Sequence, residues 1–359
     1  MEEKGKKGRM DYTLLLIVVL LVGLVILYST SAYNGQVKFH DSFYYLKKQA
    51  FATVLGIVLM LFVAGMDYHI WQRLAVFGYL AAVALSVAVM LFGREINGSK
   101  RWLALGPFSF QPSEFAKVAL ILFLADLVTK NVKTIGKMWT LCRIMFWILP
   151  IVGLVGASNL STAIIILGIG VILIFVASPK YAQFALMGIA GACFMGIFLA
   201  LESYRLERLA IWRNPEKYEK GYQTLQGLYA IGSGGVFGVG IGNSVQKLGF
   251  VPEAQNDMIF SIICEELGLA GAGIIVFLFL LLIWRFFLIA SGSRDLFGAL
   301  IATGAMAHMM IQVILNIAVV TNTIPNTGIT LPFISYGGTS VMFLLIEMGL
   351  VLSVSQVVD

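Results

Sequence analysis

Four polar stretches interrupt an otherwise apolar chain, and each contains side chains that could bind or react. The first runs from Arg101 into the motif Gln-Pro-Ser-Glu-Phe-Ala-Lys at 111–117. Glu114 and Lys117 are three residues apart, so they share one face of a helix. Ionisable groups inside an apolar helix indicate a functional site. The alternative is a structural ion pair between a glutamate and a snorkelling lysine.

The second stretch is the long polar segment 202–257, which combines basic residues with a glycine-rich run at 232–242. Its basic cluster consists of Arg205, Arg208 and Arg213. The backbone N–H groups of such a run could cradle a phosphate. The run is not a Walker A loop, because Gly-Lys-Ser/Thr is missing. The alternative is a flexible surface loop.

The third stretch ends at Asp257, directly before a strongly apolar segment. A carboxylate at such a boundary is partly desolvated, which raises its pKa and suits a general base. The alternative is a helix N-cap, which would stabilise the helix by about 1 kcal/mol and have no chemical role. Glu265 and Glu266 lie about two turns further on, so at least one must face the protein interior or a watery cavity.

The fourth stretch, 322–340, contains two prolines and no charged residue, so it cannot be helical throughout. Non-helical backbone near a membrane is tolerated where it lines a cavity or packs in protein. The three histidines and three cysteines are scattered, which predicts neither a histidine metal site nor a disulfide framework.

The composition of the chain shows which class of fold must position these four polar stretches. Of 359 residues, 59% are hydrophobic and 12% are charged, whereas soluble domains have about 45–50% and about 25%. The apolar segments are longer and more continuous than the alternating strands of a membrane β-barrel. The chain is therefore predicted to be an all-α polytopic membrane protein, and soluble, disordered and disulfide-rich classes are excluded.

About ten spans are predicted, because a helix needs about 20 apolar residues to cross the hydrocarbon layer. They are 11–30, 46–66, 74–93, 113–129, 144–157, 162–178, 181–201, 258–284, 297–320 and 338–357. We interpret residues 1–359 as a single domain, with a cytoplasmic tail at 1–10. The segment 202–257 is predicted to be a large extracytoplasmic, catalytic loop between the seventh and eighth spans.

Lysine and arginine in short loops predict the orientation of the spans. The residues expected at the cytoplasmic side are Lys4, Lys6, Lys7, Arg9, Arg73, Lys130, Lys133, Lys137, Arg143, Lys180, Arg285 and Arg294. The opposing residues are Lys38, Lys47, Lys48, Arg94, Lys100 and Arg101. The bias places both termini in the cytoplasm, and it explains the net charge of +6 without a nucleic-acid partner.

Together the motifs resemble those of the SEDS family (shape, elongation, division and sporulation) of bacteria, over nearly the whole chain. The matching phrases are Gln-Pro-Ser-Glu-Phe-Ala-Lys (111–117), Gly-Asn-Ser-Val-Gln-Lys-Leu (242–248), Pro-Glu-Ala-Gln-Asn-Asp (252–257), Glu-Glu-Leu-Gly (265–268) and Leu-Pro-Phe-Ile-Ser-Tyr-Gly-Gly (331–338). Within the family, the chain is more similar to the division and sporulation branch, typified by FtsW and SpoVE, than to the elongation branch of RodA.

The resemblance implies a peptidoglycan glycosyltransferase of the bacterial cytoplasmic membrane. Such a protein joins lipid II units by β-1,4 bonds at the outer face, releases undecaprenyl diphosphate, and works with a class B penicillin-binding protein and other division or sporulation proteins. The expected location is the division septum or the forespore. The alternatives are a lipid II flippase and a non-catalytic scaffold of the division machinery.

The resemblance also assigns roles to residues. Asp257 matches the essential aspartate of the family and is the expected base for the acceptor hydroxyl, or else the ligand of Mg²⁺ or Mn²⁺; no organic cofactor is expected. The expected substrate-binding residues are Arg101, Glu114, Lys117, Arg205, Arg208, Gln223, Lys247, Glu253, Ser335 and Tyr336. The chain departs from the family at Asn159, where relatives commonly have a carboxylate, so a charge-dependent role there is in doubt.

Overall fold

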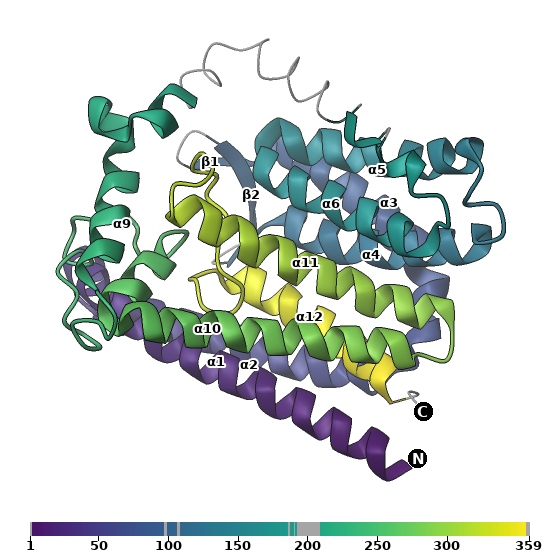
Figure 1. Ribbon diagram of the computed structural model, residues 1–359, viewed down its shortest axis with the longest axis horizontal. Helices are drawn as coiled ribbons and strands as arrows, with labels where there is room; N and C mark the ends of the chain where they lie inside the picture. Colours follow the sequence, from purple (N-terminus) through teal and green to yellow (C-terminus); the bar gives the residue numbers. More distant parts are fainter. Residues whose placement is uncertain are drawn as a thin grey trace.

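The computed structural model describes residues 2–96, 99–105, 108–185, 187–189, 191 and 209–356. Figure 1 shows long helices packed side by side, with α9 and a small sheet at one end and both termini at the other. The long helices are α1 (Glu2–Phe39), α2 (Tyr44–Ala64), α3 (Tyr68–Phe92), α4 (Pro112–Asn131), α5 (Met138–Ser158), α6 (Leu160–Ala177), α10 (Ile259–Gly292), α11 (Leu296–Val320) and α12 (Gly338–Ser355). The shorter helix α9 spans Tyr222–Ser233.

Eight helices among the described residues are long and apolar enough to cross a membrane, which confirms the polytopic helical class. They are α1, α2, α3, α5, α6, α10, α11 and α12. The predicted span 113–129 corresponds to α4, whose charged residues lower its apolar character. The predicted span 181–201 lies largely outside the described residues. The total of ten spans and the place of the long loop therefore stay predictions.

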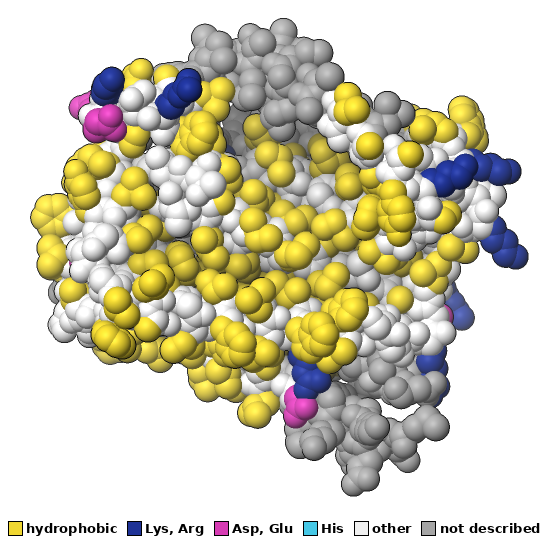
Figure 2. Space-filling view, viewed as in Figure 1, with side chains coloured by type: hydrophobic (Ala, Val, Ile, Leu, Met, Phe, Trp, Pro, Cys, Tyr) yellow, Lys and Arg dark blue, Asp and Glu magenta, His cyan; other side chains and the backbone are white. Residues whose placement is uncertain are grey.

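The distribution of side chains on the surface fits a membrane environment. Figure 2 shows hydrophobic side chains across the middle of the visible face, with lysine and arginine towards its margins. Large apolar side chains such as Phe62, Phe77 and Phe92 are more than half exposed, at 64%, 70% and 77%. A monomeric soluble protein rarely exposes so many large apolar side chains to water, whereas a membrane protein exposes them to lipid.

The interior of the bundle is built around α4 and α11. Figure 1 shows α4 beside α3, α5, α6 and α11. Most of its residues are buried, including both charged residues of its first two turns, Glu114 and Lys117. Its other charged pair lies near the opposite end, where Lys130 contacts Asp126 at 2.6 Å. The charges of α4 are thus paired near its two ends, which leaves its middle apolar.

A small antiparallel sheet follows α3, and the composition of the chain gave no sign of it. Its strands are β1 (Arg94–Ile96), β2 (Ser99–Leu105) and β3 (Phe108–Phe110), in the order β1-β2-β3. Leu103 pairs with Phe110, so β3 leads directly into the start of α4. The sheet therefore covers the end of the bundle where α4 begins.

The helix α10 is broken at Gly268, whose φ is 66° and ψ is −171°. The glycine-rich loop fills the break with backbone hydrogen bonds. Leu269 N–H donates to Gly235 O, and Ala270 N–H donates to Val236 O, both at 2.9 Å. In return, the N–H groups of the loop donate to the carbonyls of Glu265 and Glu266. Residues 234–240 thus replace the helical bonds that the break removes.

Candidate functional site

A cavity of about 960 Å³ opens at the end of the bundle that carries the sheet and α9. Its walls come from α2, α9, α11, the strands β2 and β3, the starts of α4, α6 and α12, and the loops before α10 and α12. Seven of its lining residues are charged: Lys47, Lys48, Arg101, Glu114, Lys117, Glu253 and Asp257. Segments far apart in the sequence therefore converge on one site, as expected for a binding or catalytic pocket.

Asp257 lies in the loop just before α10 and is partly buried in the cavity wall. It is not the helix cap, because Met258 is at the N-cap and makes no side-chain capping bond. Burial raises the pKa of Asp257 to about 6, and the nearby charge of Glu253 adds to the rise. Gln223 Nε2 donates to Asp257 Oδ1 at 3.4 Å, and this hydrogen bond lowers the pKa and so partly offsets the rise. A carboxylate in this state suits proton transfer near neutral pH.

Glu114 and Lys117 face the cavity from the first two turns of α4. Their side chains are almost fully buried and form an ion pair at 3.0 Å. Lys117 Nζ also donates to Gln312 Oε1 of α11 at 3.4 Å. Because the pair is buried at a cavity wall, a negative ligand group there would meet a partly desolvated ammonium.

Further positive charge comes from two other elements. Arg101 on β2 donates from Nε to the carbonyl of Ser158, at the end of α5, at 3.1 Å. Lys47 and Lys48 reach the cavity from the first turn of α2. In the sequence these lysines counted only as evidence against the predicted orientation. The structure makes them part of the site.

The segment 322–340, which was predicted not to be helical throughout, contacts Gln223, because Asn326 Nδ2 donates to Gln223 Oε1 at 3.4 Å. Residues 328–330 and 336–340 line the cavity. Tyr336 N–H donates to Gln255 O at 2.9 Å, and the Tyr336 ring packs edge-on against Tyr45. Burial raises the pKa of Tyr336 to about 12, so its hydroxyl stays protonated at neutral pH and can donate a hydrogen bond.

Two predicted substrate-binding residues lie away from the lining. Ser335 is buried and accepts the Leu331 N–H at 2.8 Å, so it holds the shape of the segment. Lys247 is buried and donates to Glu266 at 2.5 Å and to Ser29 at 3.2 Å. Neither side chain lines the cavity; both brace the loops around it. Glu265 and Glu266 are both buried, as expected for at least one of them.

In the glycine-rich run, the N–H groups of residues 238–240 donate to backbone carbonyls of the protein itself. Gly238 N–H donates to Gly234 O at 2.8 Å, and Val239 and Gly240 donate to the carbonyls of Glu265 and Glu266. A Cβ on Gly238 would lie 2.2 Å from Glu266 O. The glycines therefore permit the close backbone approach that such a run allows, and here the approach is to α10.

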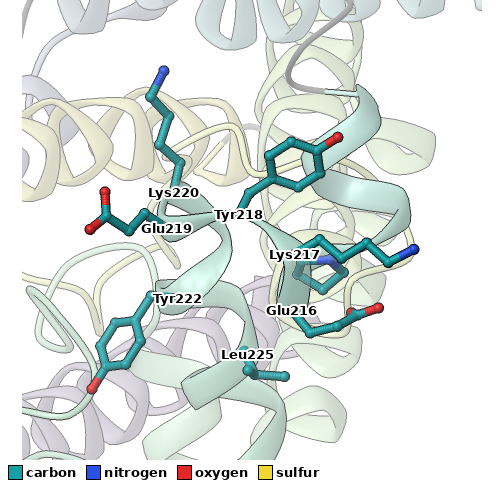
Figure 3. A pocket seen from close by; sticks show the side chains of 8 residues that line it. Glu216, Lys217, Tyr218, Glu219, Lys220, Tyr222 and Leu225 are labelled. Atoms are coloured by element: carbon teal, nitrogen blue, oxygen red, sulfur yellow. The ribbon is translucent and has the colours of Figure 1, made fainter.

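The basic cluster of the long loop is only partly described. Arg205 and Arg208 lie outside the described residues, and Arg213 is exposed and away from the cavity lining. A separate hollow of about 780 Å³ lies over residues 215–225. Figure 3 shows Glu216 and Lys217 extending to one side and Glu219 and Lys220 lying on the other, so the four charged side chains do not meet at one point. Without convergent polar groups, this hollow is a poor binding site.

Two amide side chains of α11, Asn316 and Gln312, were not singled out in the sequence, and Asn159 was noted there only as a departure from the family. Asn316 of α11 donates to the Asp257 carbonyl at 2.8 Å and to the Ile329 carbonyl at 2.7 Å. Gln312, one turn earlier, anchors Lys117. Asn159 lines the cavity and caps α6 by accepting the Thr162 N–H at 3.2 Å. Neutral amides inside apolar helices carry no pattern that separates binding from packing.

The chain is similar to known proteins over nearly its whole length. The family model FTSW_RODA_SPOVE, described as cell cycle protein, matches residues 10–359. Stage V sporulation protein E of Bacillus subtilis (strain 168) is 39% identical, with 98% of both chains covered. A probable peptidoglycan glycosyltransferase FtsW of Trichlorobacter lovleyi is 35% identical, with 96% of this chain and 93% of the relative covered.

Solved structures agree with the sequence relatives. A chain of a structure described as "Structural coordination of polymerization and crosslinking by a peptidoglycan synthase complex" has a TM-score of 0.83 at 29% identity, covering 96% of this chain and 97% of the other. The rod shape determining protein RodA of Thermus thermophilus has a TM-score of 0.71 at 28% identity, covering 96% and 95%. The resemblance indicated by the motifs is confirmed: the chain belongs to the FtsW/RodA/SpoVE family of cell cycle proteins.

Proposed function

We propose that this chain is a peptidoglycan glycosyltransferase that joins lipid II units by β-1,4 bonds and releases undecaprenyl diphosphate. The observation that carries the proposal is the cavity that brings the Asp257 carboxylate together with Lys47, Lys48, Arg101 and Lys117. The relatives named as peptidoglycan glycosyltransferases support the same conclusion.

The cavity contains the groups that such a transfer needs. Asp257 accepts the proton of the acceptor sugar's 4-hydroxyl, whose oxygen attacks the anomeric carbon of the donor. The bond from that carbon to the diphosphate oxygen breaks, with inversion from an α- to a β-linkage. The departing diphosphate gains negative charge, which Arg101 and Lys117 stabilise. With a pKa of about 6, Asp257 is mostly ionised at pH 7 and more basic than an ordinary aspartate.

The membrane side of the cavity suits the lipid part of the substrate. Phe51 and Leu55 of α2 line the cavity, yet they are 58% and 41% exposed on the apolar surface of the bundle. Isoprenoid tails can therefore stay in the bilayer beside α2 while the sugars and diphosphate enter the polar part of the cavity. This division of apolar and charged walls favours an enzyme that takes its substrates from the membrane.

A divalent cation, Mg²⁺ or Mn²⁺, fits the site only together with the substrate. Among the described residues, no group of three histidine, cysteine or acidic side chains could hold a metal ion. Mg²⁺ is often bound by one or two carboxylates plus substrate phosphates and water. Asp257 would supply the carboxylate, and the ion would supply positive charge to the diphosphate. No organic cofactor is part of the proposal.

We place the cavity at the outer face of the bacterial cytoplasmic membrane and both termini in the cytoplasm. The cavity and the termini lie at opposite ends of the bundle (Figure 1). The lysine- and arginine-rich N-terminal segment favours the cytoplasm for that end. The proposed partner is a class B penicillin-binding protein, supported by the similarity to a chain of a peptidoglycan synthase complex. The similarity to the sporulation protein supports the forespore or the septum, with other membrane proteins of that machinery.

Polymerisation by the purified chain with its partner tests this proposal. Fluorescent lipid II should be converted to glycan strands by the wild type and by Glu219→Gln, which changes an exposed carboxylate beside the second hollow. Asp257→Asn and Asp257→Ala should fold but make no polymer. Normal polymer from either variant would exclude both roles of Asp257. Lipid II translocation in vesicles that survives Asp257→Ala, without polymer from any form, would favour the flippase.

A further inference from the structure

Behind Lys117, a row of buried polar side chains runs from the cavity into the bundle. Gln312 Oε1 lies 3.4 Å from Lys117 Nζ and 2.8 Å from His308 Nε2. On its other side, His308 Nδ1 lies 2.8 Å from Glu347 Oε2 of α12. All four side chains are at most 2% exposed, so this row is sealed from water at its inner end. Every proton in it must be accounted for by the neighbours present.

The orientation of the Gln312 amide follows from the chemistry of two neighbours. Its Nε2 donates to the Thr330 backbone carbonyl at 3.0 Å, and a carbonyl can only accept. Its Oε1 faces Lys117 Nζ, which can only donate. The reversed amide would oppose acceptor to acceptor and donor to donor. Gln312 Oε1 is therefore an acceptor, and His308 Nε2 must carry a hydrogen.

The other nitrogen of His308 faces a carboxyl group in the same buried place. Glu347 Oε1 is buried and has no hydrogen-bond partner among the described residues, so within that part of the chain His308 is the hydrogen-bond partner of the carboxyl group. An isolated buried carboxylate would be very costly. Because Nδ1 and Glu347 Oε2 are 2.8 Å apart, one of these two atoms must carry a hydrogen that bonds to the other. The hydrogen is either a second ring proton on Nδ1 or the carboxyl proton of Glu347. In both cases the two groups share one proton more than a neutral imidazole beside a carboxylate, and the pair is electrically neutral.

We propose that His308 and Glu347 are positioning residues for Lys117. The shared proton satisfies Nδ1 and keeps the Nε2 hydrogen on Gln312, whose amide oxygen then holds the Lys117 ammonium at the cavity wall. Without this anchor, Lys117 would keep Glu114 as its close partner at 3.0 Å and would be drawn towards that carboxylate. The kinetic consequence rests on the proposed polymerase function; the proton count does not.

Two substitutions separate positioning from proton donation to the reaction. His308→Leu removes the donor to Gln312, so kcat should fall about 10- to 100-fold with little change in KM, as expected for a misplaced charge-stabilising group. Glu347→Gln should keep most of the activity, because an amide N–H can donate to Nδ1 and leave the hydrogen on Nε2. If the pair instead donated a proton to the leaving group, Glu347→Gln would be as defective as His308→Leu.

The protonation state can be read directly, because the chain has three histidines and two of them, His40 and His69, are exposed. In full-length protein carrying His40→Gln and His69→Gln, labelled with ¹⁵N-histidine, one imidazole remains. We expect a hydrogen on Nε2 in both forms, with the shared proton near Nδ1 in the parent and Nδ1 unprotonated after Glu347→Gln. A parent imidazole protonated on Nδ1 but bare on Nε2 would overturn the proposal.

Asp126→Asn is the matched control, since Asp126 is another buried carboxylate, paired with Lys130 and Gln72 away from the cavity. It should leave kcat unchanged. Adding Gln312→Ala to His308→Leu should cause no further loss if both act through Lys117. Wild-type turnover from His308→Leu would also overturn the proposal. If His308→Leu does not fold, the ¹⁵N spectra of the His308 imidazole still test the proposal. If the wild type makes no polymer, the proposed polymerase function fails, and the spectra still test the protonation of His308 and Glu347.

Discussion

Asn316 and Asp257 are joined by a hydrogen bond of 2.8 Å from the Asn316 side-chain amide to the Asp257 carbonyl. The same amide nitrogen donates to Ile329 O at 2.7 Å, so one fully buried side chain of α11 ties together two walls of the cavity. A backbone bond of this kind fixes where the Asp257 carboxylate points without touching the carboxylate itself. The position of the proposed base is thus set by a helix on which no charged residue marks the site.

Replacing Asn316 should therefore damage turnover more than substrate binding. Asn316→Ala leaves two buried carbonyls without their donor, at a cost of about 1–3 kcal/mol in the free energy of unfolding. It should also lower kcat by about tenfold or more through misplacement of Asp257. Steady-state polymerisation and thermal unfolding measure the two effects. Asn243→Ala, at an exposed loop position where the amide donates to Val239 O, should leave kcat unchanged; an unaltered kcat in Asn316→Ala would contradict the role given to Asn316.

The pH dependence of polymerisation should show the titration of Asp257. With a pKa of about 6, the base becomes protonated as the pH falls, so kcat/KM should decline below pH 6. Gln223→Ala removes a hydrogen bond that favours the ionised form, so the decline should move to higher pH. Glu253→Gln removes a negative charge that favours the protonated form, so the decline should move to lower pH. Shifts in the same direction would contradict this account of the electrostatics.

Asp257 should also reduce stability at neutral pH. Its pKa in the fold, about 6, lies above the ordinary 3.8, so the folded state binds more protons than the unfolded state between these values. The free energy of unfolding therefore falls as pH rises through that window, by on the order of 1–3 kcal/mol at 1.36 kcal/mol per pKa unit. Asp257→Asn should melt higher than the wild type at pH 8, and this advantage should shrink towards pH 4. A lower melting temperature at pH 8 would refute the prediction.

The glycines at the break in α10 should tolerate no side chain. A Cβ on Gly268 would lie 2.4 Å from Gly238 N, and both residues have a positive φ. Gly268→Ala and Gly238→Ala must therefore separate the loop from the helix and should lower the melting temperature strongly. Gly273→Ala, in the same helix with no atom within 4 Å of its Cβ, should be neutral or stabilising by up to about 1 kcal/mol. Equal melting of all three variants would contradict the described contact.

Asn159 is expected to be replaceable by aspartate but not by alanine. Its side chain accepts the Thr162 N–H at the start of α6, and aspartate caps a helix equally well. Asn159→Asp should keep the melting temperature, whereas Asn159→Ala should lose about 1 kcal/mol. If Asn159→Asp melts at as low a temperature as Asn159→Ala, the prediction is wrong, because the cost of adding a negative charge to the cavity wall then exceeds the stabilisation by the helix cap.

The long helices could be predicted from the sequence because a long, continuous apolar segment is a strong signal. The short elements, α9 and the strands of the sheet, have weaker signals. Helix α9 lies inside the polar loop and is only 12 residues long. The strands β1 and β3 have three residues each. Such elements are held by neighbours rather than by their own composition, so propensity does not reveal them.

For the site, the sequence indicated the charged residues and missed those that hold them. Arg101, Glu114, Lys117 and Asp257 line one cavity, as do Gln223, Glu253 and Tyr336. Charge in an apolar chain is conspicuous, so these residues stood out. Lys247 was equally conspicuous but is used to brace Glu266. Whether a charged side chain lines the cavity or supports a neighbouring loop depends on the path of the backbone in the folded protein, and no local sequence pattern reveals that path.

The interruption of α10 has a mechanical consequence. As a straight rod, its 34 residues would extend about 51 Å, well beyond a hydrocarbon layer about 30 Å thick. The part after Gly268 is long enough to cross the layer alone, which leaves the first turns as a separate arm beginning two residues after Asp257. Because the glycine-rich loop is hydrogen-bonded both to this arm, at Glu265 and Glu266, and to the start of the transmembrane part, at Leu269 and Ala270, a displacement of the loop by an attached protein would act on both parts of α10 at their junction.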